Sequence, residues 1–559
     1  MTIIVEKGTE GTVYRAAKLL DIPNIDLLTF LFDSDKSDAR EDSILHADAA
    51  NPHNCITKAQ ARELTKQTAF TLRNSFGIGT FGPNKDVVSA ICTGHYLSPI
   101  LFWGTVAAGG VYSAASTAST PSELARLIRL GESKLLVCTP DTKDVAVAAA
   151  KECQFPMDRL VVIDSMSEWR LTSIVSGINS LLDGKMEWTR ITDKLELENS
   201  LVCLIYSSGT TGLPKGVKIS HLNFVAECCI IVDEYKEYNR KYNPNYKYRT
   251  VAHLPTAHIA GIQGYFINPF YYGGTVYWMP KFDFLKFLEY CKKFKVTSFF
   301  TVPPIYLLIA KSPLVTDQFD TLETAISGAA PLGKDLQHAA SKKLGKGKCS
   351  ISQTWGLSES TGSATFMPHG ESDDTGSVSK LIPNTQARIV DENDNDVTPG
   401  EPGEIWLKSP VVTNGYYNNP AANAEAFSRD GWFKTGDIGA FRNGLFYILD
   451  RKKELIKYKG TQVAPAELEA VLLSHPDIMD AAVIGVEGEG TEVPRAYVVA
   501  DRKKVNEKKV QEWVKGRTAR NKRLRGGVVF VDAIPKSPSG KILRKDLREL
   551  ARREGRARL

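Results

Sequence analysis

Residues 201 to 216 read LVCLIYSSGTTGLPKG, an apolar run that leads directly into a loop of glycines, hydroxyl side chains and one lysine. The apolar run predicts a buried strand. Glycines allow several main-chain N–H groups to point at one anion, and the hydroxyls and Lys215 add donors and positive charge. A flexible linker is the simpler interpretation of such a loop, but the strand before it, its Pro-Lys-Gly ending and a helix after it indicate a phosphate site. It is not a Walker A loop, because Gly216 stands where that motif has Ser or Thr.

Strand-like and helical patterns alternate through the first two thirds of the chain, which predicts an α/β fold with a large N-terminal domain of doubly wound sheets. Strand patterns occur at residues 296–302 and 321–327, and a helical pattern occurs at 221–235. After about residue 385, short strands separated by turn residues predict a β-rich, more antiparallel subdomain. Within it, Asn443-Gly444 predicts a two-residue hairpin.

A chain of 559 residues is too long for one typical core, so at least two domains are expected. We place the boundary just after the predicted hairpin. This gives an N-terminal domain of residues 1–451 and a small, mobile α+β C-terminal domain of residues 452–559. The smaller domain is expected to contain a helix that begins near Pro465, several strands and a basic helix.

The composition, with 43% apolar and 24% charged residues, is typical of a soluble globular protein. Nine scattered cysteines suggest neither a disulfide framework nor a metal site, which favours a reducing, intracellular location. The uncharged stretch 96–115 has the length of a membrane span, but Pro99 and Gly109-Gly110 divide it into a helix and a strand. We therefore expect no membrane span.

Positive charge is concentrated near the C-terminus, since residues 502–525 contain eleven Lys and Arg residues and only two Glu residues. A solvated helix face explains such a patch, and a site for an anionic small molecule or nucleic acid is the alternative. No nucleic-acid-binding module accompanies the patch, so no nucleic-acid partner is expected.

Six further motifs follow the loop, and together they identify a resemblance that extends over nearly the whole chain. They are LPTAHIAG at 254–261, SGAAPL at 327–332, QTWGLSES at 353–360, KTGDIG at 434–439, LDRKKELIKYKGTQVAPAELE at 449–469 and PKSPSGKILRKDL at 535–547. In this order they resemble the adenylate-forming (ANL) superfamily, in particular acyl-CoA synthetases and 4-coumarate:CoA ligases. The resemblance implies an AMP-forming acid–thiol ligase, with residues 1–451 as its AMP-binding domain. A carboxylic acid reacts with ATP and Mg²⁺ to form acyl-AMP and pyrophosphate, and coenzyme A then displaces AMP to form acyl-CoA.

The resemblance also implies which residues hold the nucleotide. The loop would hold the phosphates through Ser207, Ser208, Gly209, Thr210, Thr211, Gly212 and Lys215. The remaining nucleotide contacts would come from Gly328, Ala329, Ala330, Gln353, Thr354, Trp355, Gly356 and Ser358. Trp355 stands where the family commonly has a tyrosine against adenine, and its indole could stack in the same way. Asp437 and Arg451 would hold the ribose, and Glu359 would bind Mg²⁺.

Three residues carry the catalytic roles that the resemblance implies. Lys541 would neutralise charge at the α-phosphate and the acid in the first step, while Lys457 would reach the site only after the C-terminal domain rotates about Lys453. His258 would lie at the wall between the acid pocket and the thiol entrance, or it is simply a buried core histidine. The face that carries Lys457 would border the pantetheine tunnel through Lys459, Gly460 and Gln462.

Three further expectations concern the acid, the acceptor and the location. Residues 258–270 contain no carboxylate, so a plain aromatic or fatty acid is favoured over an amino acid. A carrier protein could replace coenzyme A as acceptor, and a nucleotide-binding protein without catalysis is the alternative from a different class. Ala557-Arg558-Leu559 resembles a peroxisomal address, which predicts an import receptor as partner and a peroxisomal, otherwise cytoplasmic, location.

Overall fold

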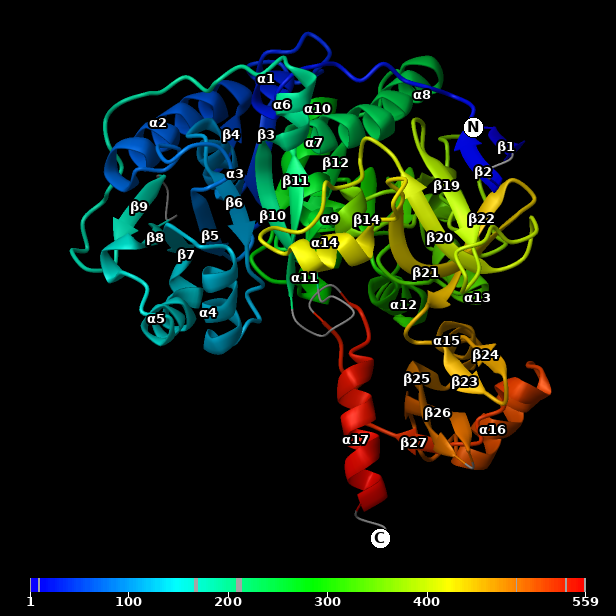
Figure 1. The fold of residues 1–559 in the computed structure, drawn as a ribbon. Helices are drawn as coiled ribbons and strands as arrows, with labels where there is room; N and C mark the ends of the chain where they lie inside the picture. The colour runs from blue at the N-terminus through cyan, green and yellow to red at the C-terminus, as the bar shows by residue number, and fades with distance from the viewer. Residues whose placement is uncertain are drawn as a thin grey trace.

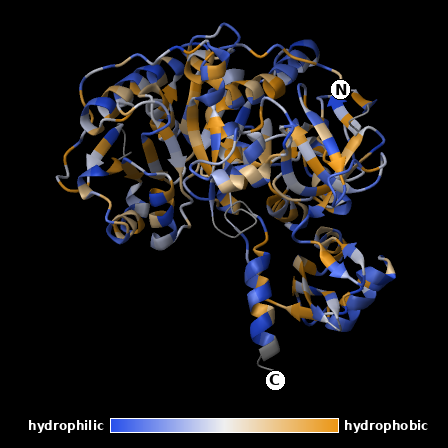
Figure 2. Ribbon diagram, viewed as in Figure 1, coloured by the Kyte–Doolittle hydropathy of each residue, from blue (hydrophilic) through white to orange (hydrophobic). Residues whose placement is uncertain are grey.

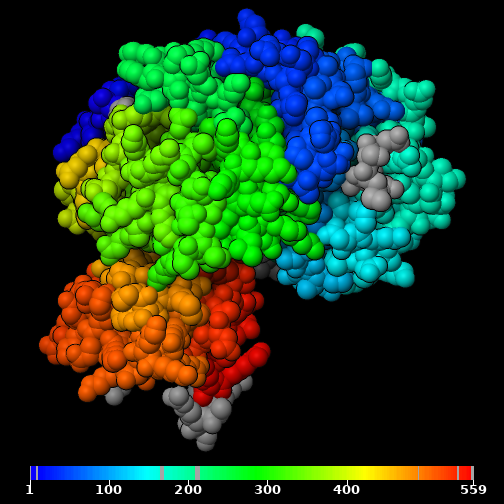
Figure 3. Space-filling model, turned by 180° about the vertical axis from the view of Figure 1, so that it is seen from behind, coloured from blue at the N-terminus to red at the C-terminus, as the bar shows by residue number. Residues whose placement is uncertain are grey.

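The computed structural model describes residues 2–8, 11–164, 169–207, 214–488, 490–537 and 540–556. A large body contains the N-terminal sheets, and a smaller C-terminal domain lies beside one end of it (Figure 1). From behind, the C-terminal domain packs directly against the segments near residue 300 (Figure 3). The predicted α/β class is confirmed by this architecture.

The largest sheet has seven strands in the order β11-β10-β6-β5-β7-β8-β9. Its central strands are parallel and buried, as expected for a sheet with helices on both faces. The strands are β5 (Val87–Ile91), β6 (Val111–Ala114), β7 (Leu135–Cys138), β8 (Leu160–Asp164), β9 (Arg170–Ser173), β10 (Leu201–Ser207) and β11 (Lys215–Ser220). Helices beside them are α2 (Lys58–Phe76), α3 (Ser98–Ala107), α4 (Pro121–Leu130), α5 (Lys143–Glu152) and α6 (Lys194–Asn199).

The expected strand–loop–helix order around the glycine-rich loop needs one correction. The strand before the loop is β10, as predicted, but the loop leads into β11, which pairs antiparallel with β10 before helix α7 (His221–Cys228) begins. Val217 and Ile219 are β-branched and buried, a pattern that favours a strand over a helix. The stretch 96–115 forms α3 and β6, which confirms that it is a helix and a strand of the core.

Two smaller sheets complete the centre of the body. One has the order β12-β13-β3-β4, and the other is the parallel sheet β14-β15-β16. Their strands are β3 (Ile44–Asp48), β4 (Cys55–Thr57), β12 (Arg249–Ala252), β13 (Thr275–Trp278), β14 (Ser298–Thr301), β15 (Thr324–Ser327) and β16 (Ile351–Gln353). The helices around them are α1 (Leu27–Phe32), α8 (Glu234–Tyr242), α9 (Ile259–Ile262), α10 (Asn268–Tyr272), α11 (Phe284–Lys293), α12 (Pro303–Lys311) and α13 (Lys334–Ser341).

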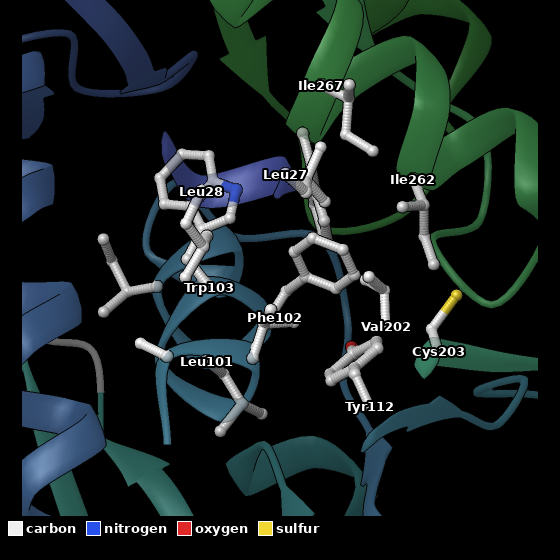
Figure 4. Packing of buried hydrophobic residues seen from close by; sticks show 14 of the residues in the cluster. Leu27, Leu28, Leu101, Phe102, Trp103, Tyr112, Val202, Cys203, Ile262 and Ile267 are labelled. Atoms are coloured by element: carbon white, nitrogen blue, oxygen red, sulfur yellow. The ribbon is translucent and has the colours of Figure 1, made fainter. Parts of the chain in front are cut away.

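A continuous apolar core joins these layers. Residues of α1, α3 and α9 converge on β6 and β10, with Phe102, Trp103 and Ile262 fully buried among them (Figure 4). Strands in the interior are mostly apolar, while the outer helices carry the polar residues (Figure 2). Burial of such large side chains contributes roughly 1.5–3 kcal/mol each, so this core holds the sheets in fixed positions.

The predicted β-rich subdomain is a six-stranded antiparallel sheet with a short β17–β18 pair beside it. Asn443 and Gly444 both have positive φ and connect its last two strands, which confirms the hairpin. The sequence did not reveal that the N-terminal hairpin joins this sheet. The strands are β1 (Ile3–Gly8), β2 (Gly11–Ala16), β17 (Thr365–Phe366), β18 (Lys380–Leu381), β19 (Gln386–Val390), β20 (Gly403–Lys408), β21 (Phe433–Arg442) and β22 (Leu445–Arg451), and helix α14 (Pro420–Ala426) lies nearby.

The C-terminal domain has its own hydrophobic cluster, which begins with Ile456. Its elements are β23 (Ile456–Tyr458), β24 (Thr461–Val463), α15 (Pro465–Leu473), β25 (Ile478–Gly488), β26 (Thr491–Ala500), α16 (Glu507–Lys515), β27 (Val528–Phe530) and α17 (Arg544–Arg556). Polar contacts join it to the body at several points: Lys311 donates to the carbonyl of Ile478, Gln462 Nε2 donates to Glu392 Oε1 at 3.0 Å, and the Ala466 N–H donates to Asp450 Oδ2 at 2.9 Å.

All nine cysteines are free thiols. Within the described ranges, no helix is both long and apolar enough to cross a membrane.

Candidate active site

A cavity opens at the carboxyl ends of β14, β15 and β16, where the side of the C-terminal domain that carries Lys541 meets the body. Ligands in open α/β sheets commonly bind at this edge. The cavity offers about 130 Å³ to the centres of water-sized molecules, roughly ten times the need of one water. It can therefore hold the ring or chain of a small organic acid.

Lys541 forms part of the cavity wall although it belongs to the C-terminal domain. It lies on a tight loop in which the Lys541 N–H donates to Ser537 Oγ at 3.1 Å and Gly540 has φ +80°. A Cβ on Gly540 would lie 3.3 Å from Val302 Cγ2. The glycine thus lets the loop approach the start of α12 closely.

Charged side chains surround Lys541. Burial lowers the pKa of Lys541, the Arg451 guanidinium lowers it further, and Asp437 and Glu359 act in the opposite direction. The residue therefore faces a set of charges contributed by three different segments of the N-terminal domain. A lysine whose pKa is lowered in a cavity is a functional candidate on physical grounds.

Both ends of the glycine-rich loop lie near Glu359. Ser207, the last residue of β10, donates to Glu359 Oε1 at 3.1 Å, and the Tyr416 hydroxyl donates to the same oxygen at 3.0 Å. Lys215 Nζ lies 5.1 Å from the centre of the Tyr416 ring. The other predicted phosphate ligands, Ser208, Gly209, Thr210, Thr211 and Gly212, lie outside the described residues.

Asp437 and Arg451 face each other across the β21–β22 hairpin, where they are paired in register. Arg451 Nε lies 2.7 Å from Asp437 Oδ1, and the Trp355 indole N–H donates to Asp437 Oδ2 at 2.7 Å. Each oxygen of the carboxylate keeps a further lone pair that can accept a ribose hydroxyl.

Trp355 is buried in the core beside this carboxylate. Its neighbours Thr354 and Gly356 line the cavity, but the indole does not. The structure thus gives Trp355 a hydrogen-bonding contact that the sequence did not suggest. Stacking of the indole on adenine stays a prediction.

His258 lies in the cavity wall at the start of α9. Its Nδ1 accepts a hydrogen bond from the Ala260 N–H at 3.3 Å, which leaves the proton of a neutral ring on Nε2. Burial, and then the charge of Lys541, lower the pKa of His258 to about 3. At neutral pH the side chain is therefore an uncharged hydrogen-bond donor.

The small residues of the SGAAPL motif follow β15. Ala329 lines the cavity with φ +68°, and Ser358 lines it from the following motif. Gly328 packs closely against Phe300 and Thr354, which leaves no room for a larger side chain. Ala330 is half-buried and is not part of the cavity wall.

Gln353 makes hydrogen bonds to other residues of the protein interior. Its Oε1 accepts from the Leu332 N–H at 3.1 Å, and its Nε2 donates to Gln337 at 3.2 Å. It does not line the cavity.

The second group of predicted residues lies away from the cavity. Lys457 is exposed on β23, and Lys459 and Gly460 form the turn of the β23–β24 hairpin. Gln462 contacts Glu392, as described above. The structure thus brings Lys541 to the site and leaves Lys457 outside it.

The cavity and site residues that the sequence analysis missed include Tyr416, Glu227, Gln263 and Asn268. Tyr416 follows no motif and reaches Glu359 from a distant loop. Glu227, however, interrupts the apolar run FVAECCIIV, and that interruption was a usable signal.

Comparison with known proteins identifies the family. The family model described as "AMP-binding enzyme" matches residues 38–417, and the model described as "AMP-binding enzyme C-terminal domain" matches residues 467–541. The chain belongs to the AMP-binding enzyme family. The resemblance to the adenylate-forming superfamily is thereby confirmed.

Relatives in this family match the chain over nearly its full length. A "Putative acyl-coenzyme A synthetase" of Emericella nidulans is 52% identical over 96% of this chain and 98% of that protein. "Phenylacetyl-CoA ligase epaB" of Aspergillus niger is 36% identical over 95% of this chain and 97% of that protein. The crystal structure of ATP-bound MatB from Rhodopseudomonas palustris superposes with a TM-score of 0.79 at 29% identity, covering 94% of this chain and 98% of that one.

These findings confirm the predicted activity at the level of the reaction. This AMP-binding enzyme is an AMP-forming acid–thiol ligase: it uses ATP to activate a carboxylic acid as acyl-AMP and forms the thioester of coenzyme A.

Proposed function

We propose that the structure has the arrangement in which the acid is adenylated, with Lys541 as the catalytic residue of that step. The observation that carries the proposal is the position of Lys541 in the cavity wall beside His258. The ribose candidates Asp437 and Arg451 support it, because both contribute to the electrostatic environment of the same lysine.

In this step a carboxylate oxygen of the acid forms a bond to the α-phosphorus of ATP, and pyrophosphate leaves. Lys541 holds the carboxylate and the α-phosphate together and neutralises the negative charge that develops. The incoming acid and the phosphates add negative charge near Lys541, which favours its ammonium form despite its burial. His258, whose pKa is lowered to about 3 chiefly by burial, contributes a neutral N–H donor at the cavity wall.

We propose Glu359 as the Mg²⁺ ligand. Its Oε1 is held by Ser207 and Tyr416, and such supporting hydrogen bonds are typical of carboxylates that bind metals. In the described part of the chain no three His, Cys, Asp or Glu side chains cluster to hold a metal, so phosphate oxygens and waters would complete the coordination. When bound, Mg²⁺ would neutralise the charge of the departing pyrophosphate.

For the second step we propose that the C-terminal domain turns about Lys453 and presents Lys457 in place of Lys541. Such a turn must break the contacts Lys311–Ile478, Gln462–Glu392 and Ala466–Asp450, none of which is an ion pair. Lys459, Gly460 and Gln462 would then border the channel for the pantetheine of coenzyme A. Two half-reactions would thus use two faces of one small domain.

The experiment that tests the proposal is carboxylate-dependent exchange of pyrophosphate into ATP across aromatic, medium-chain and long-chain acids. Acyl-CoA formation with free coenzyme A is measured on the same panel. Exchange without acyl-CoA, together with loading of a holo-carrier protein, would favour the carrier-protein alternative. No exchange with any acid would favour a binding protein without catalysis.

We also propose peroxisomal import through Ala557-Arg558-Leu559, which lie outside the described residues. The proposal rests on the sequence of these three residues alone. Import of a tagged chain, with and without a substitution of Leu559 by Ala, tests it.

A further inference from the structure

A polar cluster lies within the mostly apolar wall of the cavity. Glu227 and Gln263 are only 2% and 4% exposed, and Asn268 lines the cavity beside them. Over the described residues, four of their atoms are buried without a hydrogen-bond partner: Glu227 Oε2, Gln263 Oε1, Gln263 Nε2 and Asn268 Oδ1. A buried polar atom without a partner has lost its hydration without compensation, so four at one place in a cavity indicate a polar ligand group.

Local backbone geometry brings these side chains together. Glu227 is on α7 directly before the π-helical segment 229–233, and Gln263 begins a second π-helical segment, Gln263–Ile267. A Cβ on Gly362 would lie 3.7 Å from Glu227 Oε1 and 3.9 Å from Gln263 Cγ, so one loop borders both side chains. Single π-turns inside helices occur frequently at functional sites.

The cluster lies away from the reacting end of the cavity. His258, whose pKa is lowered in part by the charge of Lys541, is the N-cap of the helical segment that begins at Ile259, and Gln263 lies five residues further along it. At about 1.5 Å per residue, this places Gln263 roughly 7 Å further from the start of the helix, and Asn268 lies further still. An acid whose carboxylate contacts Lys541 would direct its opposite end toward the cluster.

We infer that the cavity takes a carboxylic acid with a hydroxyl group at the end remote from its carboxylate, and that Glu227, Gln263 and Asn268 determine this specificity. The inference rests on the proposed function, because Lys541 must hold the carboxylate end. A hydroxyl group both donates and accepts, so it can pair with the Gln263 amide N–H and with the neighbouring oxygens at once.

An ammonium group fits less well. It could satisfy the oxygens but would leave Gln263 Nε2 without an acceptor, and it would require an ionised Glu227. Burial raises the pKa of Glu227 to about 8, with a hydrogen bond from Asn268 acting in the opposite direction. Near neutral pH the carboxyl therefore keeps its proton and suits a neutral partner.

Matched pairs of acids test the inference with the full-length wild-type enzyme. Decanoic acid is compared with 10-hydroxydecanoic acid, and 3-phenylpropanoic acid with 3-(4-hydroxyphenyl)propanoic acid, by kcat/KM for pyrophosphate exchange. We expect the hydroxylated acid of at least one pair to be preferred by ten-fold or more, because the unsubstituted acid leaves the buried polar atoms unpaired. An aminated analogue, 3-(4-aminophenyl)propanoic acid, is included.

Variants then assign the preference to the cluster. Gln263→Leu and Glu227→Leu should lower the ratio of kcat/KM for the hydroxylated acid to that for its parent acid by ten-fold or more. Glu227→Gln keeps hydrogen-bonding atoms and should retain most of the preference. Ile231→Val, a change to an apolar residue of the same wall, is the control and should leave the ratio of the two acids unchanged.

The outcomes distinguish a failure of the proposed function from a failure of the hydroxyl inference. If no acid supports exchange, the proposed function fails. If parent acids exchange as well as or better than their hydroxylated partners, or the aminated acid is preferred, the proposed function stands and the hydroxyl inference is overturned. Because this comparison uses wild-type enzyme, poor folding of a variant cannot leave it undecided.

Discussion

Replacing Glu227 by Gln should change how the stability of the enzyme depends on pH. Burial raises the pKa of Glu227 from 4.5 to about 8. Between these values the unfolded chain releases the proton while the folded protein keeps it. The stability that the neutral carboxyl supports is therefore complete below pH 4.5 and is lost as the pH rises toward 8.

The size of the effect follows from the same shift. Each pH unit in this window changes the free energy of unfolding by about 1.4 kcal/mol, so the change from pH 5 to pH 7.5 is about 3 kcal/mol. At roughly 2.1 cal/mol/K per residue, unfolding of a domain of about 450 residues has an entropy near 0.9 kcal/mol/K, which converts this change to about 3 °C in Tm. Glu227→Gln cannot titrate and should lack this contribution.

The assay is thermal unfolding of wild type and Glu227→Gln at pH 5 and at pH 7.5. The Tm of wild type minus that of the variant should fall by about 3 °C between the two conditions. Glu401→Gln, a change at an exposed position, controls for the loss of a carboxyl group. A difference between wild type and Glu227→Gln that does not change with pH would refute the claim that this carboxyl is buried and neutral.

Three further variants test separate parts of the site. Trp355→Phe removes the hydrogen bond to Asp437, and since a bond to a charged group contributes about 1.5–3 kcal/mol, KM for ATP in the exchange assay should rise about ten-fold or more. An unchanged KM would show that the bond does not position the ribose contact. Glu359→Gln should raise the Mg²⁺ concentration needed for half-maximal exchange, whereas an unaltered Mg²⁺ titration would exclude it as the ligand. Lys311→Ala removes the contact with the carbonyl of Ile478 and should slow exchange more than thioester formation from supplied acyl-AMP; the opposite order would argue against the arrangement described.

Much of the fold was predictable because it rests on local patterns. The apolar run of β10 and the Asn443-Gly444 turn each depend on a few adjacent residues, and both were identified from the sequence. The pairing of the N-terminal hairpin with β19 was not, because the partners Tyr14 and Ala387 are far apart in the chain and nothing local specifies their register.

The candidate site was also predictable only where its residues belong to local motifs. Motifs indicated Lys541, Asp437 and Glu359, since these residues stand within short recognisable segments. Tyr416 and the polar cluster of Glu227, Gln263 and Asn268 were missed because their roles depend on contacts between distant segments. Neither the position of the C-terminal domain nor the side it presents to the cavity is encoded in any short segment.

The most direct test of the central claim is to separate the two half-reactions in Lys541→Ala and Lys457→Ala. Pyrophosphate exchange reports acyl-AMP formation, and acyl-CoA formation from supplied acyl-AMP reports the thiol step. Lys541→Ala should lose exchange by about a hundred-fold or more and largely keep the thiol step, because loss of one electrostatic contact in a transition state has effects of this size. Lys457→Ala should keep exchange and slow the thiol step. Equal losses of both activities in both variants would contradict the division of work between the two faces of the C-terminal domain.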